Sequence, residues 1–148
     1  MRTVSAEIHI DAPPATVWAV LIDLASYHEW NPLFVAADGN VAAGQRITLR
    51  SRRPASDRLT TVRPTVTKAD PESDLSWVAS IPGIITGEHS FALSPAGRGT
   101  RLVQRETFRG LLASIPNPAF DNAETSFRAM NEALRARAEG RATGPAQH

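Results

Sequence analysis

The chain has 148 residues, of which 42% are hydrophobic and 21% are charged, and these proportions are typical of one globular domain with a real core. Its 16 basic and 15 acidic residues nearly cancel, so the overall charge does not favour nucleic acid or an anionic membrane as a partner. The absence of cysteine excludes a disulfide framework, a thiol nucleophile and a thiolate metal site.

The first residues, MRTVSAEIHIDAPP, lack the apolar run of a signal peptide. No stretch of the sequence is apolar for long enough to cross a bilayer. We therefore expect a cytoplasmic protein without integral membrane association.

A strand and a helix open the chain. The stretch VSAEIHI alternates apolar and polar residues, which predicts a half-buried strand. Pro13 and Pro14 then precede ATVWAVLIDL, whose apolar residues fall on one helical stripe. The segment SYHEWNPLF ends this region, because the residue before Pro32 is disfavoured in a helix.

The middle of the chain is rich in β-branched residues and in turn signals. These predict strands near 33–42, 45–52, 58–69, 74–80, 86–94 and 99–109. Short turns between consecutive strands indicate an antiparallel meander.

A long amphipathic helix follows Asn117-Pro118. Its apolar stripe is formed by Phe120, Ala123, Phe127, Met130 and Leu134. We expect Gly140 to end this helix, so that residues 1–140 form a single domain and residues 141–148 a flexible tail. The sheet and the helix each have one apolar face to bury, which predicts an α+β fold with the helix laid across a curved sheet.

The last two strands form a hairpin whose register brings polar residues together. If Leu93 pairs with Leu102, His89 lies opposite Glu106 and Phe91 opposite Gln104, all on one face. The other face carries Arg101 and Arg105 and suits solvent better, so we expect His89 and Glu106 to point inward. They are then either a structural polar pair in the core or a polar contact at the bottom of a ligand pocket.

Several segments together resemble the SRPBCC superfamily of START-like, helix-grip domains, which includes polyketide cyclase/dehydrase-like proteins. They are SYHEWNPLF, Leu75-Ser76-Trp77, GEHSF, GTRLVQRETFRGLL and MNEALRARAE, in an order that spans residues 3–139. The resemblance implies seven antiparallel strands curved around the C-terminal helix, two short helices at one end, and a cavity for an apolar molecule. Members include cyclases, hydroxylase subunits and lipid carriers, so the family alone does not decide the chemistry.

Candidate ligand-contacting residues follow from the inward faces and from this resemblance. They are Trp30, Phe34, Trp77, His89, Phe91, Gln104, Glu106, Phe108, Leu112, Phe127 and Met130. Trp30 is interpreted as a lid or as a staple between helices and sheet. The apolar loop at 110–115, which includes Leu112, is either a gate or a seal.

Other chemistry is not indicated by the sequence. The arginines at 46, 50, 52, 53, 58 and 63, and at 101, 105 and 109, are interpreted as a solvated outer surface rather than a nucleic-acid interface. The histidines at 9, 28, 89 and 148 lack ligand spacing, so we expect neither a metal nor another cofactor.

The leading hypothesis is a binding protein for a hydrophobic small molecule that is aromatic, polyketide-like or lipid-like. The alternative is an enzyme of the cyclase or dehydratase type, in which His89 acts as the base and Glu106 orients it. A third possibility is an accessory role with a vestigial cavity. The oligomeric state stays open.

Overall fold

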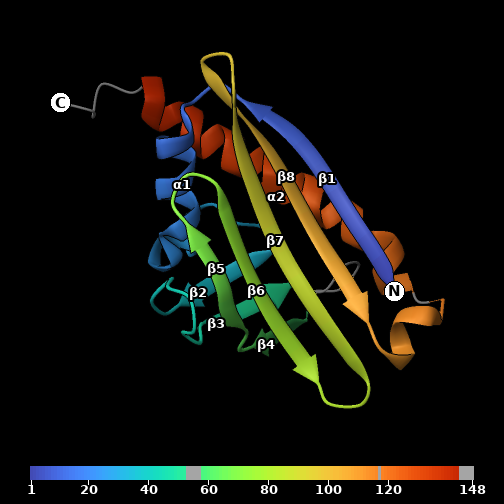
Figure 1. Cartoon of the computed structure of the whole chain (residues 1–148). Coiled ribbons are helices and arrows are strands. Elements are labelled where there is room, and N and C mark those ends of the chain that lie inside the picture. Colours follow the sequence, from blue (N-terminus) through green and yellow to red (C-terminus); the bar gives the residue numbers. More distant parts are fainter. Residues whose placement is uncertain (53–57, 117, 144–148) are drawn as a thin grey trace.

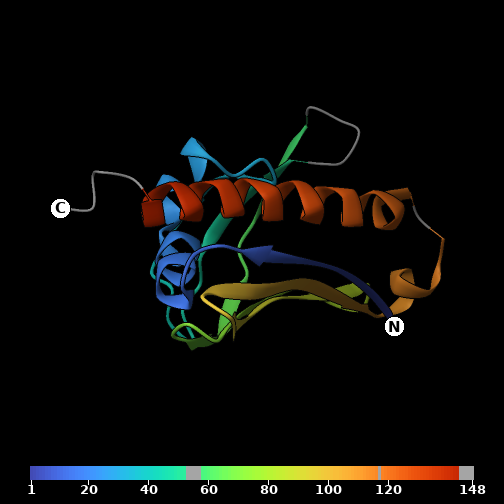
Figure 2. The same cartoon turned by 90° about the horizontal axis from the view of Figure 1, so that it is seen from above.

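A computed structural model describes residues 1–52, 58–116 and 118–143 of the chain. These residues form an α+β fold in which a long helix lies along one face of a curved antiparallel sheet (Figures 1 and 2). The elements in chain order are β1 (Arg2–Ile10), α1 (Pro14–Ile22), the 3₁₀ helix η1 (Leu24–Glu29), β2 (Phe34–Asp38), β3 (Thr48–Arg52), β4 (Leu59–Val62), β5 (Thr65–Asp70), β6 (Asp74–Ile81), β7 (Ile85–Ala96), β8 (Gly99–Arg109), the 3₁₀ helix η2 (Leu111–Ser114) and α2 (Pro118–Thr143).

The strands form two sheets that join at one edge. The larger has the order β1-β8-β7-β6-β5 and the smaller the order β2-β3-β4, with every neighbouring pair antiparallel. Backbone hydrogen bonds connect residues 44–47, just before β3, with residues 64–66 at the start of β5. The smaller sheet therefore continues the curve of the larger one, as the helix-grip fold requires.

One of the seven expected strands is broken. Residues 58–69 were predicted to be one strand, but the described part of this range divides into β4 and β5 on either side of Arg63-Pro64. Pro64 has no N–H to donate to a ladder, and its carbonyl accepts a hydrogen bond from the Ile47 N–H at 3.0 Å. β4 consequently pairs with β3, whereas β5 pairs with β6.

The C-terminal helix extends past its expected end. Gly140 does not stop α2, which continues to Thr143. Ala138 is fully buried and Ala142 packs against the core, so the last turn is anchored by contacts that override the helix-ending tendency of glycine. Residues 144–148 of the predicted tail lie outside the described residues.

The core lies between the inner face of the large sheet and the apolar stripe of α2. The alternation predicted for the first strand is confirmed, since Ala6 and Ile10 are buried while their neighbours face solvent. The predicted stripe of α2 is also confirmed, because Phe127, Met130 and Leu134 are almost fully buried. Among the described helices, none combines the length and the apolar character needed to cross a membrane.

The segment between α1 and β2 holds the first strand of the small sheet in place. The Tyr27 hydroxyl donates a hydrogen bond to the Leu21 carbonyl at 2.5 Å, and burial together with nearby Asp23 raises the pKa of Tyr27 well above its usual range. The Asn31 side-chain oxygen accepts hydrogen bonds from the Leu33 and Phe34 N–H groups, each at 2.9 Å. This turn directs Leu33 and Phe34 toward the interior.

Replacing Asn31 with alanine should therefore lower the free energy of unfolding by about 2 kcal/mol, because two buried N–H donors lose their acceptor. Asn31→Asp is the matched control. It keeps the accepting oxygen and replaces the Nδ2 group, which has no hydrogen-bond partner among the described residues, with a carboxylate oxygen whose charge the two N–H donors stabilise. In chemical denaturation, the aspartate variant should lose less than half as much free energy of unfolding as the alanine variant. Equal losses for the two variants would contradict this role of Asn31.

Candidate functional site

The hairpin of β7 and β8 has the predicted register. Leu93 pairs with Leu102, Phe91 with Gln104 and His89 with Glu106. The His89 side chain is 3% exposed and that of Glu106 is 23% exposed. The imidazole and the carboxylate thus point inward together, and the carboxylate is the more accessible of the two.

Aromatic rings surround the imidazole of His89. Their centroids lie 5.0 to 5.5 Å from the imidazole centroid, and the rings belong to Phe34, Trp77, Phe91 and Phe127. Trp77 and Phe91 stack on the ring, whereas Phe34 meets it edge-on. This packing fixes the position of His89 and removes water from most of its surface.

The two imidazole nitrogens of His89 have different partners. Nε2 lies 2.9 Å from Gln104 Oε1, within hydrogen-bond distance. Nδ1 lies 3.7 Å from Glu106 Oε1, which is longer than a hydrogen bond but close enough for the carboxylate to balance an imidazolium charge. A small movement of Glu106 would bring the two groups into proton-transfer contact.

Gln104 connects this pair to the long helix. Its Nε2 donates to Asn131 Oδ1 at 2.8 Å and to the Phe127 carbonyl at 3.3 Å. The Asn131 Nδ2 group donates in turn to the Ala6 carbonyl on β1 at 3.2 Å. Gln104 and Asn131 are almost fully buried, so a continuous polar chain crosses the core from β1 to the pocket.

Two adjoining cavities lie next to Glu106. The inner one has a volume of about 170 Å³ and the outer one about 580 Å³. Val62, Ala79, Gly87 and Glu106 line both, so these residues form the junction. The walls are mostly apolar, and Glu106 is the only acidic side chain among the described residues that line them.

Because Gly87 has no side chain, the Glu106 carboxylate can occupy the space beside it. A methyl group at Gly87 would lie 3.1 Å from Glu106 Oε2 and 3.6 Å from the Phe108 ring. The first distance is tighter than normal van der Waals contact, so any side chain here would push the carboxylate or narrow the junction.

The structure brings six of the predicted ligand contacts together. Phe34, Trp77, His89 and Phe127 line the inner cavity, Phe108 lines the outer cavity, and Glu106 lines both.

Five predicted contacts line neither cavity. Phe91 and Gln104 lie behind His89, where they stack on its ring and hydrogen-bond to its Nε2. Met130 is fully buried on the side of α2 that faces the core. Trp30 packs edge-on against Tyr27 with ring centroids 5.2 Å apart, a contact within one segment that leaves both the lid and the staple interpretations open. Leu112 is 42% exposed on η2, and its N–H donates to the Ile84 carbonyl at 3.2 Å.

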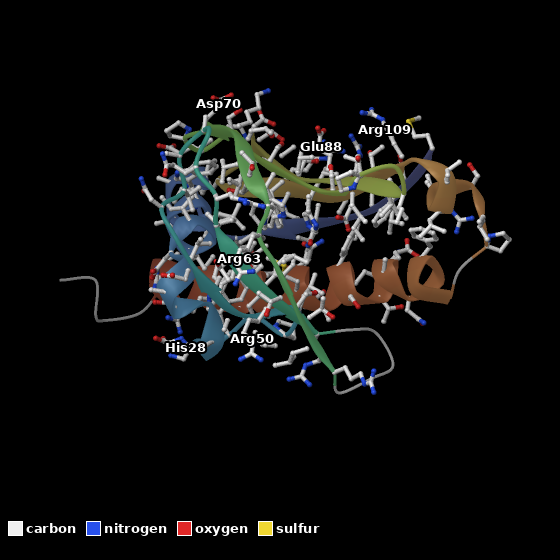
Figure 3. The ribbon with its side chains drawn as sticks, turned by 90° about the horizontal axis from the view of Figure 1, so that it is seen from below. His28, Arg50, Arg63, Asp70, Glu88 and Arg109 are labelled. Carbon is white, nitrogen blue, oxygen red and sulfur yellow. The ribbon has the colours of Figure 1, made fainter. Side chains whose placement is uncertain are left out.

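Sequence reasoning placed Phe34 of β2 in the site but missed the contributions of β3 and β4. Leu49, Ser51 and Val62 line the cavities from β3 and β4. For β3 the available signal was the alternation of Leu49 and Ser51 with Arg50 and Arg52 in the sequence. Arg46 and Arg63 are exposed, as expected, but they border the outer cavity rather than the outer sheet surface. Figure 3 shows Glu88 and Arg109 on the outer side of the sheet and Arg63 on the side that faces α2. Arg53 lies outside the described residues.

Comparison with known proteins identifies related sequences and folds. The sequence matches the family described as polyketide cyclase/dehydrase and lipid transport over residues 1–140. A comparison with curated proteins finds no match.

Solved structures of three bacterial proteins share the fold. The Zhui aromatase/cyclase from Streptomyces sp. R1128 is 20% identical with a TM-score of 0.76, and the alignment covers 97% of this chain and 96% of that one. Protein MLL2253 from Mesorhizobium loti is 22% identical with a TM-score of 0.74 and coverages of 93% and 97%. A START superfamily protein from Mycobacterium smegmatis is 18% identical, with a TM-score of 0.74 and coverages of 93% and 97%.

Gly87→Ala should weaken the binding of an apolar dye such as 1-anilinonaphthalene-8-sulfonate about tenfold, because the added methyl crowds the junction of the cavities. Gly140→Ala is the control, since its added methyl meets no atom within 4 Å and lies on the far part of α2. Fluorescence titration measures both affinities. Equal affinities for the two variants would show that the dye does not use this junction.

Proposed function

The chain belongs to the polyketide cyclase/dehydrase and lipid transport family, and from that premise we propose that it binds a hydrophobic small molecule in the cavities beside Glu106. The molecule is aromatic, polyketide-like or lipid-like. The observation that carries the proposal is a mostly apolar pocket with one inward carboxylate at its centre.

The size and lining of the pocket support this proposal. The outer cavity, at about 580 Å³, falls within the range of small-molecule sites, whereas the inner cavity, at about 170 Å³, suits a single ring or a short chain. Apolar walls provide affinity, and a few polar groups fix the orientation of the ligand.

Glu106 is the group that sets this orientation in the proposal. As a carboxylate it accepts a hydrogen bond from a hydroxyl, phenol or enol at the inner end of the ligand. Arg46 and Arg63 are exposed residues that line the outer cavity, where they supply cationic groups. A ligand with a hydroxylated apolar end and a polar or anionic far end would match both regions.

A second function is supported by the pairing of His89 with Glu106 at 3.7 Å. In the dehydration step of a cyclase or dehydratase reaction, the pair removes a proton from the carbon beside a carbonyl group and returns a proton to the departing hydroxyl, which leaves as water while a carbon–carbon double bond forms. The exposure of the two side chains favours Glu106 as the group that contacts substrate and His89 as its proton partner. This reverses the roles that the sequence suggested.

Binding should depend on the hydroxyl of the ligand. We expect 2-naphthol to bind with one-to-one stoichiometry and Glu106→Gln to weaken that binding several-fold, because a charge-assisted hydrogen bond becomes a neutral one. Naphthalene, which lacks the hydroxyl, is the matched control ligand and should bind both proteins equally. Displacement of a fluorescent dye and native mass spectrometry measure these affinities. A protein that excludes every apolar probe would end the binding proposal.

The enzymatic alternative predicts a separation of binding from turnover. With a β-hydroxy ketone that can lose water, Glu106→Gln and His89→Ala should each reduce the rate by on the order of 100-fold while the substrate still binds. Glu88→Gln is the control. Glu88 lies on β7, as His89 does, but on the outer face of the sheet, so this variant should keep the rate of the unmodified protein. Full turnover in both pocket variants would exclude this chemistry.

A further inference from the structure

The polar chain behind His89 begins at two backbone carbonyls. The Ala6 carbonyl lies 3.2 Å from Asn131 Nδ2, and the Phe127 carbonyl lies 3.3 Å from Gln104 Nε2. A carbonyl oxygen accepts hydrogen bonds and cannot donate them. Each carbonyl therefore requires an amide nitrogen opposite it, which fixes how both side-chain amides are turned.

The direction of every other hydrogen bond in the chain follows. With its nitrogen on Ala6, Asn131 presents Oδ1 to Gln104, whose Nε2 donates to it at 2.8 Å. Gln104 consequently presents Oε1 to His89 Nε2 at 2.9 Å. An amide oxygen only accepts, so Nε2 of His89 must carry the hydrogen.

Reversing this direction would be costly. Turning the Gln104 amide would place its oxygen against both the Phe127 carbonyl and the Asn131 oxygen. As whole residues, Gln104, Asn131 and His89 are 0%, 1% and 2% exposed, so water does not reach them to replace the lost hydrogen bonds. An unpaired buried polar group costs about 1 to 3 kcal/mol.

We propose that Gln104 and Asn131 are positioning residues that hold His89 as the Nε2–H tautomer and aim the open Nδ1 lone pair at Glu106. Proton exchange at His89 is then confined to Nδ1, on the side of the pocket. Nε2 keeps its hydrogen because it is tied into the buried chain. The tautomer is a property of the folded protein alone, whereas its use in proton transfer rests on the proposed function.

Among the described residues, one ionisable side chain is recorded in contact with His89. The packed elements contribute Phe34 from β2, Trp77 from β6, Phe91 from β7 and Phe127 from α2. β8 contributes Gln104 and Glu106. Among the described contacts of the imidazole, Glu106 is therefore the single charged group, and a proton that reaches Nδ1 is exchanged with Glu106 or with a ligand bound beside it.

Nitrogen-15 NMR of the imidazole side chains tests the tautomer directly, since protonated and unprotonated ring nitrogens differ in chemical shift. For neutral His89 we expect Nε2 to be protonated and Nδ1 to be unprotonated, with His89→Gln used to assign the signals. The opposite tautomer in the unmodified protein would overturn the proposal without any variant being needed.

The Gln104→Met variant tests whether Gln104 sets the tautomer of His89. Methionine fills a similar volume but offers no strong acceptor to Nε2, so the Nδ1–H tautomer, which can donate to Glu106, should gain about tenfold in population ratio. The exposed His9 is an internal control whose signals should not change. A folded Gln104→Met protein that keeps the original tautomer ratio would show that Gln104 does not set it.

Binding of 2-naphthol to the same NMR samples separates the two claims. The expected tautomer in a protein that binds neither 2-naphthol nor any other apolar probe would refute the proposed function and leave the role of Gln104 and Asn131 intact. Binding of 2-naphthol together with the opposite tautomer would refute the role of Gln104 and Asn131 and leave the proposed function intact.

Discussion

The packing of α2 on the large sheet depends on the hydrogen bonds that the inward polar side chains of the β7–β8 hairpin make. His89, Gln104 and Glu106 share the face of the sheet that faces α2, where unpaired polar atoms are costly. Gln104 is satisfied by Asn131 and by the Phe127 carbonyl, both from α2. The helix therefore supplies hydrogen-bond partners as well as apolar surface, and its position along the sheet is set by both.

The pocket lies beside Glu106 because the described part of α2 does not cover this side chain with hydrogen-bond partners as it covers Gln104. Among the described residues, no side-chain amide is recorded against Glu106, whose recorded ion-pair partner is His89 Nδ1 at 3.7 Å, and Gly87 beside it contributes no side chain. The break at Pro64 moves β4 away from β6, and the cavities lie between β3 and β4 on one side and β6 to β8 on the other. Apolar walls around one accessible carboxylate are the feature that links this fold to ligand binding.

Local patterns predicted much of this structure. Alternation in the hairpin predicted the pairing of His89 with Glu106, and the spacing of apolar residues predicted the buried stripe of α2, because both depend on the period of a regular element. Contacts between distant segments were not accessible in this way. Nothing local in the sequence indicates that Asn131 meets Gln104, or that Arg46 and Arg63 turn toward the pocket. Trp30 likewise carried no signal that distinguished a lid from a staple.

The central claim is that a hydroxylated apolar molecule enters this pocket and meets the Glu106 carboxylate. A crystal structure of the protein soaked with 6-bromo-2-naphthol tests it most directly, because anomalous scattering locates the bromine independently of the rest of the ligand. The account predicts a bromine peak in the cavity region, with the naphthol oxygen within hydrogen-bond distance of Glu106. Bromine peaks confined to the outer surface, with the cavities filled by protein side chains, would contradict it.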